Sequence, residues 1–142
     1  MALRVFISYA KSDRDLADDL RARLEHIADD VILVAPKLKQ ETAWSAALLA
    51  ELKKAHQILV LLTPNSLHSP NVQVTIGAGV ALQKQIVPIV VGLDEAALPG
   101  WVRRLHFVKY PELSTYLLDL ARQAGKEAAA VHGAPAKAGV TR

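Results

Sequence analysis

Residues 58–63 read Ile-Leu-Val-Leu-Leu-Thr and form one of the most apolar runs in the sequence. A short run that is apolar at nearly every position predicts a strand with both faces buried. Strands of this kind are typical of the centre of a parallel sheet that carries helices on both sides. The segment therefore predicts an α/β domain with this strand near the middle of its sheet.

Strand-like and helix-like patterns alternate on either side of this central segment. Short apolar runs predict strands over residues 3–8, 31–35 and 85–91, and a weaker run predicts an edge strand over 105–108. Apolar side chains recur at helical spacing between the strands. These helices are expected to begin near Ser12, near Thr42, at Pro70 and at Pro111. The alternation predicts a doubly wound, mostly parallel five-stranded sheet flanked by helices.

The helix after the central strand has the clearest start. Ser69 is a good N-cap, and Pro70 suits the first helical position because its ring fixes the backbone angle that a helix needs. The spacing predicts that Val72, Ile76 and Val80 face the core. In sheets of this class, ligands bind beyond the carboxyl ends of the strands. The loops after residues 8, 35 and 63 therefore form the expected site.

Composition narrows the functional classes. The chain has no cysteine, which excludes disulfides and thiolate metal sites and is compatible with a cytoplasmic protein. Its five histidines show no ligand spacing, so we expect no metal. The net charge of +3 is mild and the basic residues are scattered, which argues against nucleic acid as a partner. The apolar runs are too short to span a membrane, and no signal peptide is visible.

Several segments together carry a family resemblance. Residues 5–9 read Val-Phe-Ile-Ser-Tyr and are followed by Ser12 and Asp13, and a polar loop precedes Trp44. The central strand then leads to residues 76–89, which read Ile-Gly-Ala-Gly-Val-Ala-Leu-Gln-Lys-Gln-Ile-Val-Pro-Ile. Over roughly residues 3–120 the chain resembles a bacterial Toll/interleukin-1 receptor (TIR) domain. The resemblance implies a flavodoxin-like TIR fold. We expect one domain over residues 1–128 and a disordered tail over residues 129–142.

The resemblance also implies two kinds of activity. Many TIR domains bind NAD and cleave the bond between nicotinamide and ribose. Many act by self-association or by docking to other TIR domains, often in immune signalling. The chain is accordingly expected to have other TIR domains as partners and NAD as its ligand or substrate.

Thr75 departs from the family pattern at the position that matters most for catalysis. The family keeps a catalytic glutamate in a motif resembling S-x-W-x-x-x-E-I-G. Residues 69–77 here read Ser-Pro-Asn-Val-Gln-Val-Thr-Ile-Gly, so Asn71 replaces the tryptophan and Thr75 replaces the glutamate. A hydroxyl can bind a ribose but cannot stabilise positive charge on it. The sequence therefore predicts a degenerate catalytic site.

The remaining candidates each have a structural alternative. Ser8, Tyr9 and Asp13 could line a nucleotide pocket, or could end the first strand and begin the next helix. Trp44 could stack on a nucleotide base, or could anchor its helix in the core. Ser66 and Ser69 could contact phosphate or ribose, although capping already explains Ser69.

The loop before Trp44 supplies the expected docking residues Lys37, Lys39 and Glu41, unless it is only a solvated loop. Glu41 is also the candidate to replace the missing catalytic carboxylate. Two functions remain open: an assembly module with a degenerate NAD site, and an active NAD nucleosidase that uses an unusual residue. A phospho-receiver domain would need acidic residues where Tyr9 and Thr63 stand.

Overall fold

A computed structural model of the chain describes residues 3–33 and 49–123. Its centre is a parallel five-stranded sheet with the strand order β2-β1-β3-β4-β5. The strands are β1 (Arg4–Ser8), β2 (Asp30–Leu33), β3 (Gln57–Leu62), β4 (Gln85–Val90) and β5 (Val108–Lys109). The predicted doubly wound sheet is confirmed. The expected tail and Trp44 lie outside the described residues.

β3 is the central strand, as its sequence predicts. All six of its residues are buried, and it pairs with β1 on one side and β4 on the other. Its side chains alternate between two apolar clusters. Leu59 and Leu61 enter one cluster, whereas Ile58 and Val60 enter the other. This explains why the run is apolar at successive positions.

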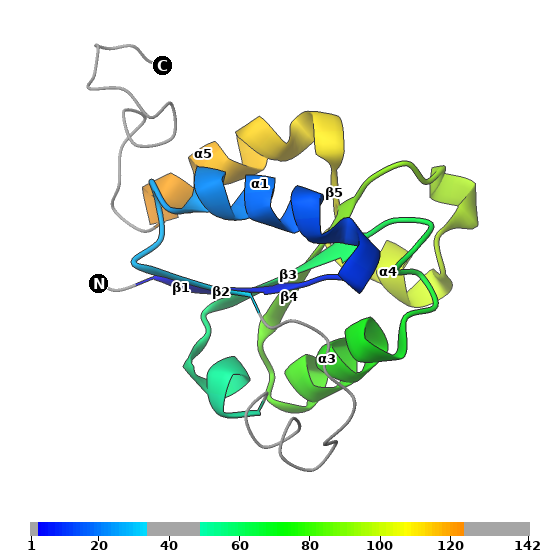
Figure 1. The fold of residues 1–142 in the computed structure, drawn as a ribbon, viewed down its shortest axis with the longest axis horizontal. Coiled ribbons are helices and arrows are strands. Elements are labelled where there is room, and N and C mark those ends of the chain that lie inside the picture. Colours follow the sequence, from blue (N-terminus) through cyan, green and yellow to red (C-terminus); the bar gives the residue numbers. More distant parts are fainter. Residues whose placement is uncertain (1–2, 34–48, 124–142) are drawn as a thin grey trace.

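The helices form one layer on each face of the sheet (Figure 1). Helices α1 (Arg14–Leu24) and α5 (Leu113–Gln123) cover one face. The other face carries a helical segment at residues 49–54, α3 (Pro70–Ala81) and α4 (Gly100–Arg104). Short 3₁₀ turns η1 (Lys11–Asp13), η2 (Glu95–Ala97) and η3 (Tyr110–Glu112) lie between these elements.

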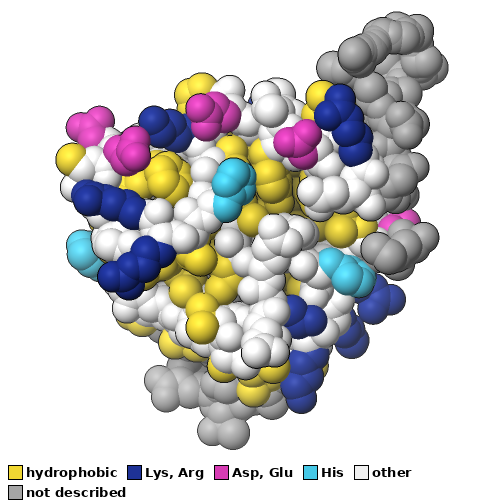
Figure 2. All heavy atoms as spheres, turned by 180° about the vertical axis from the view of Figure 1, so that it is seen from behind, with side chains coloured by type: hydrophobic (Ala, Val, Ile, Leu, Met, Phe, Trp, Pro, Cys, Tyr) yellow, Lys and Arg dark blue, Asp and Glu magenta, His cyan; other side chains and the backbone are white. Residues whose placement is uncertain are grey.

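The last strand is shorter than the sequence predicts. β5 pairs only with Ile89 and Val90 of β4, so residues 85–88 have no described strand on that side. Leu105 and Phe107, expected in the strand, instead pack half-buried against the cluster beneath α4. Figure 2 shows this side of the molecule, where hydrophobic side chains are partly uncovered between charged ones. These residues belong to the connection between the end of α4 at Arg104 and the start of β5 at Val108.

The inward face of α3 differs from the predicted one. Val72 is buried as expected and Ile76 is half-buried, but Val80 is 60% exposed. Gly79 is buried in its place, because the helix backbone lies directly on the sheet there. A Cβ added at Gly79 would lie 2.8 Å from Ile58 Cδ1. The prediction was wrong because it ranked residues by apolar character and overlooked how closely a glycine allows helix and sheet to approach.

The two glycines in the middle of α3 should respond to alanine with opposite signs. A Cβ at Gly77 meets nothing within 4 Å. Gly77→Ala should therefore raise the free energy of unfolding by about 0.5–1 kcal/mol, because alanine is the better helix former. Gly79→Ala should lower it by about 1 kcal/mol, because the added methyl group overpacks the core. Urea denaturation of the two variants and the parent measures both effects, and equal responses would contradict the packing described here.

Candidate functional site

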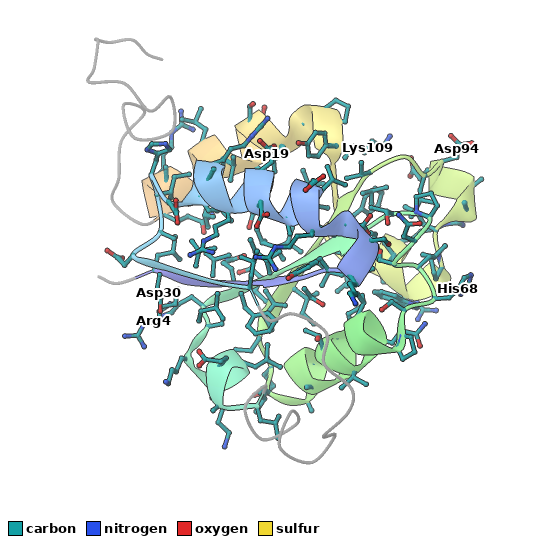
Figure 3. The ribbon with its side chains drawn as sticks, in the orientation of Figure 1. Arg4, Asp19, Asp30, His68, Asp94 and Lys109 are labelled. Carbon is teal, nitrogen blue, oxygen red and sulfur yellow. The ribbon has the colours of Figure 1, made fainter. Side chains whose placement is uncertain are left out.

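The candidate site lies where the strand order reverses. The chain leaves β1, crosses to β2 on one side and later enters β3 on the other, so the carboxyl ends of β1 and β3 flank a topological switch point. Ligands of doubly wound sheets bind at such points. In Figure 3, Arg4 and Asp30 mark the amino ends of the strands, and His68 and Asp94 lie beyond the carboxyl ends. The loops after Ser8 and after Leu62 meet at this second end.

A buried hydrogen-bond network joins these two loops. Asp13 is only 5% exposed, and its Oδ2 accepts from Thr63 Oγ1 at 2.6 Å. Its Oδ1 accepts from Asn65 Nδ2 at 3.0 Å. Thr63 Oγ1 in turn accepts from the backbone amides of Asn65 and Ser66. We call Asp13, Thr63, Asn65 and Ser66 the loop network. Both carboxylate oxygens of Asp13 are engaged within it.

The loop network gives a structural role to Asp13 and Ser66, two of the predicted site residues. Ser12 was expected to cap the first helix, but the chain first makes the η1 turn, and no side-chain cap is found on α1. Asp13 stands at the N-cap of α1 and turns its carboxylate to the loop after β3 instead. Ser66 Oγ donates to the carbonyl of Leu61 at 2.7 Å and accepts from the amide of Thr63 at 2.9 Å. The Ser66 hydroxyl therefore stabilises its own loop.

Thr63 and Asn65 are the members of the network that sequence reasoning missed. Thr63 directly follows the apolar central strand and Asn65 comes two residues later, at the edge where sites form. Their position after the central strand could therefore have identified them as candidate site residues. Their partner Asp13 lies fifty or more residues away in the sequence, and only the folded sheet brings it to them.

Ser8 and Tyr9 point to opposite layers of the molecule. Tyr9 packs in the cluster under α1 and α5, and its hydroxyl accepts a hydrogen bond from Arg14 Nη1 at 3.4 Å. Ser8 follows Phe6 by two positions, and Phe6 belongs to the cluster beneath α3 and α4. Ser8 is 2% exposed, and its Oγ has no hydrogen-bond partner among the residues that the structure describes. A buried hydroxyl without a partner costs about 1–3 kcal/mol.

Thr75 lies in the second turn of α3, in the same layer as Ser8. It is 1% exposed, and α3 packs against β1, β3 and β4. The residue at the family's glutamate position therefore faces the sheet and not the solvent. Ser69 is confirmed as the N-cap of α3, because its side chain accepts from the amide of Val72 at 3.5 Å and Pro70 follows it.

Four predicted residues lie outside the described part of the chain. Trp44 and the docking residues Lys37, Lys39 and Glu41 all fall between residues 34 and 48. Within residues 3–33 and 49–123, no three histidine, cysteine or acidic side chains come together in a way that could hold a metal. None of the helices in the same ranges is long and apolar enough to cross a membrane.

Comparisons with known proteins place this geometry in a family. The TIR domain family model matches residues 5–123. Among solved structures, the fold is similar to the TIR domain of the Toll-related receptor TRR-2 from the lower metazoan Hydra magnipapillata, with a TM-score of 0.63 and 18% sequence identity. That match covers 86% of this chain and 98% of the receptor domain. No curated protein matches the chain. Since the family model spans the whole sheet and its helices, the chain belongs to the TIR domain family.

Proposed function

We propose that this chain is a signalling and assembly module that binds other TIR domains and has a nucleotide pocket for an NAD-like ligand without the usual catalytic group. The observation that carries the proposal is Thr75. It occupies the inward face of α3, where the family resemblance places a glutamate, and it is neutral and buried. The resemblance to bacterial TIR domains further suggests a cytoplasmic immune-type or NAD-linked pathway.

The chemistry of NAD cleavage explains why the charge of the residue at position 75 matters. Positive charge develops on the ribose as the nicotinamide leaves, and a carboxylate beneath the ribose stabilises that charge. A charge pair at about 4 Å contributes on the order of 4 kcal/mol near a protein surface. Thr75 can offer a hydrogen bond but no charge. A pocket built around it favours binding over cleavage.

The buried acidic residue after β1 and two acidic residues of α1 are poorly placed to take over this task. Asp13 is the one acidic residue buried within the described ranges, and its oxygens are held by Thr63 and Asn65. On α1, Asp18 pairs with Arg14 and Asp19 pairs with Arg23, each one helical turn away. These three carboxylates are already engaged and are therefore poor replacements for the family glutamate.

The buried hydroxyl of Ser8 supports a ligand pocket on the α3 side of the sheet. An unpaired polar group at the carboxyl end of β1 can be satisfied by a hydroxyl or a phosphate of a bound molecule. On the α1 side of the switch point, the loop network already satisfies the polar side chains. We therefore place the proposed nucleotide pocket between the end of β1 and the start of α3.

The second candidate function is an active NAD nucleosidase in which Glu41 supplies the carboxylate. Glu41 lies outside the described residues, in the loop that the family resemblance assigns to docking and to covering the site. The two candidates differ in one measurable property, which is whether the unmodified chain releases nicotinamide.

We expect the purified chain to release no nicotinamide from NAD above the rate of a protein-free control, even at high protein concentration and under crowding. Chromatography of the reaction mixture measures the release, and ligand-observed NMR with NAD measures binding in parallel. Glu41→Ala serves as the matched variant. Clear turnover by the parent that is lost in Glu41→Ala would establish the nucleosidase and refute the proposal.

A further inference from the structure

The two helical layers of the domain differ in charge. Helices α1 and α5 carry four basic and four acidic residues, and most of these join in ion pairs such as Arg14–Asp18. On the opposite face of the sheet, the segment 49–54, α3, the turn after it and α4 together have one acidic residue, the half-buried Glu51. They have five basic residues, which are Lys53, Lys54, Lys84, Arg103 and Arg104. None of the five forms an ion pair within the described ranges.

The layer with the basic excess also carries protruding aliphatic side chains. Leu49 is 40% exposed, Val74 is 47% exposed and Val80 is 60% exposed, and these are the exposed large hydrophobic residues of the described chain. Figure 1 shows the segment 49–54 and α3 on the same face of the sheet. We call the exposed aliphatic residues and the lysines of this layer the outer basic surface, which comprises Leu49, Lys53, Lys54, Val74, Val80 and Lys84.

The turn after α3 brings the three lysines together. Gln83 has a left-handed backbone with φ of 57°, and the amide of Lys84 donates to the carbonyl of Gly79 at 2.9 Å. This is the usual way to end a helix and reverse the chain. The Lys84 Nζ then donates to the carbonyl of Lys53 at 2.8 Å. The end of α3 is thereby joined to the end of the segment 49–54, where the other two lysines lie.

Helix ends account for part of this positive charge but not for all of it. The carboxyl end of a helix carries about half a negative charge, which attracts basic side chains. Lys53 and Lys54 stand in the last turn of their segment, and Lys84 bonds to a carbonyl there. Three full positive charges exceed what the ends of this segment and of α3 require. The surplus is available to an anionic partner.

The exposed aliphatic side chains favour a lipid bilayer over other anionic partners. Single-stranded nucleic acid is bound by cations together with aromatic side chains on which the bases stack. The outer basic surface has no aromatic residue, and the half-buried Trp101 of the same layer packs into the cluster beneath α3 and α4. A second copy in the same orientation would bring lysines against lysines, which repel. An anionic bilayer matches both features, because its headgroups attract lysine and its acyl boundary takes up aliphatic side chains.

We propose that the outer basic surface binds an anionic lipid bilayer, with its lysines at the headgroups and its three aliphatic side chains at the acyl boundary. The inference goes beyond the proposed NAD and docking roles, because it concerns the place where the domain is held. Each basic residue near such a bilayer strengthens binding about fivefold. A contact of this size is reversible, and salt weakens it by screening the charges. Binding gathers copies on a surface and raises the concentration at which they meet.

Cosedimentation of the full chain with vesicles tests the role of the charges. The parent should bind vesicles of equal parts phosphatidylglycerol and phosphatidylcholine, and should not bind vesicles of phosphatidylcholine alone. Lys53→Gln with Lys54→Gln should weaken binding about twentyfold, since two basic residues are removed. Arg14→Gln with Arg21→Gln on α1 is the matched control, because it changes the net charge equally, and it should weaken binding less than about threefold. Equal losses in the two variants would overturn the assignment to this surface.

A fluorescent label tests which side of the domain meets the lipid. The chain has no cysteine, so one introduced thiol carries the label at a single position. An environment-sensitive dye on Val80→Cys should shift to shorter wavelength when the mixed vesicles are added, whereas the same dye on Asp15→Cys of α1 should not. Equal responses would overturn the proposed orientation. An oligonucleotide that binds the chain and displaces it from the vesicles would assign the surface to nucleic acid instead. If the mixed vesicles bind no protein, this inference fails and the proposed NAD and docking roles are unaffected.

Discussion

Thr75→Glu should give this chain an NAD-cleaving activity about three orders of magnitude above that of the parent. In the proposed pocket, Thr75 lies on the face of α3 that packs against the sheet, and it brings no charge to the ribose. Restoring a carboxylate contributes on the order of 4 kcal/mol to the transition state. Each 1.36 kcal/mol corresponds to a tenfold change in rate, which gives roughly a thousandfold increase.

Thr75→Gln is the matched control for this experiment. Glutamine has nearly the size and shape of glutamate but carries no charge, so it should leave nicotinamide release at the level of the parent. Because Thr75 is 1% exposed, both variants insert a larger side chain into a packed layer, and thermal melting must show that both remain folded. A folded Thr75→Glu protein that releases no more nicotinamide than Thr75→Gln would refute the assignment of this position to the catalytic group.

Asp13→Ala should lower the free energy of unfolding by about 3 kcal/mol. Hydrogen bonds to a charged group contribute roughly 1.5–3 kcal/mol each, and buried groups that lose their partner add a further penalty. The substitution removes the acceptor of the Thr63 hydroxyl at 2.6 Å and of the Asn65 amide at 3.0 Å. It also separates the loop after β1 from the loop after β3. Urea denaturation followed by circular dichroism measures the loss.

Asp18→Ala on α1 is the control for the loop network. Asp18 pairs with Arg14 at 3.1 Å, but the side chains are 50% and 54% exposed. An ion pair this exposed contributes about 0–1 kcal/mol, and salt weakens it further. The control should therefore change stability by less than a third of the effect of Asp13→Ala. Similar losses in the two variants would contradict the structural role given to the network.

The sheet could be predicted from the sequence because its signals are local. The apolar run of β3 and the Ser69-Pro70 start of α3 each depend on neighbouring residues, and both are confirmed. The short β5 could not be predicted in the same way. Leu105 and Phe107 are apolar enough for a strand, but the cluster beneath α4 takes them up. Tertiary packing decides between these outcomes, and a window of sequence does not contain it.

The candidate site was harder to predict, because it depends on which way side chains point and on contacts between residues far apart in the sequence. Ser8 and Tyr9 are adjacent in sequence and were grouped as one pocket, but successive side chains of a strand point to opposite faces. That rule was available from the sequence. The engagement of Asp13 was not, because its partners Thr63 and Asn65 lie on another loop. The two loops meet only because β1 and β3 are neighbours in the sheet, and the sequence alone does not show this order.

The two edge strands of the sheet also determine how readily a strand of another chain can pair with it. At one side β5 offers only two paired residues, and the neighbouring β4 carries Pro88, which has no amide hydrogen to give to an incoming strand. At the other side, the described part of β2 is Asp30–Leu33, and it begins with the exposed Asp30. Short, interrupted borders are poor templates for fibrils built by strand addition. Addition of a further strand at the β5 edge is thereby disfavoured.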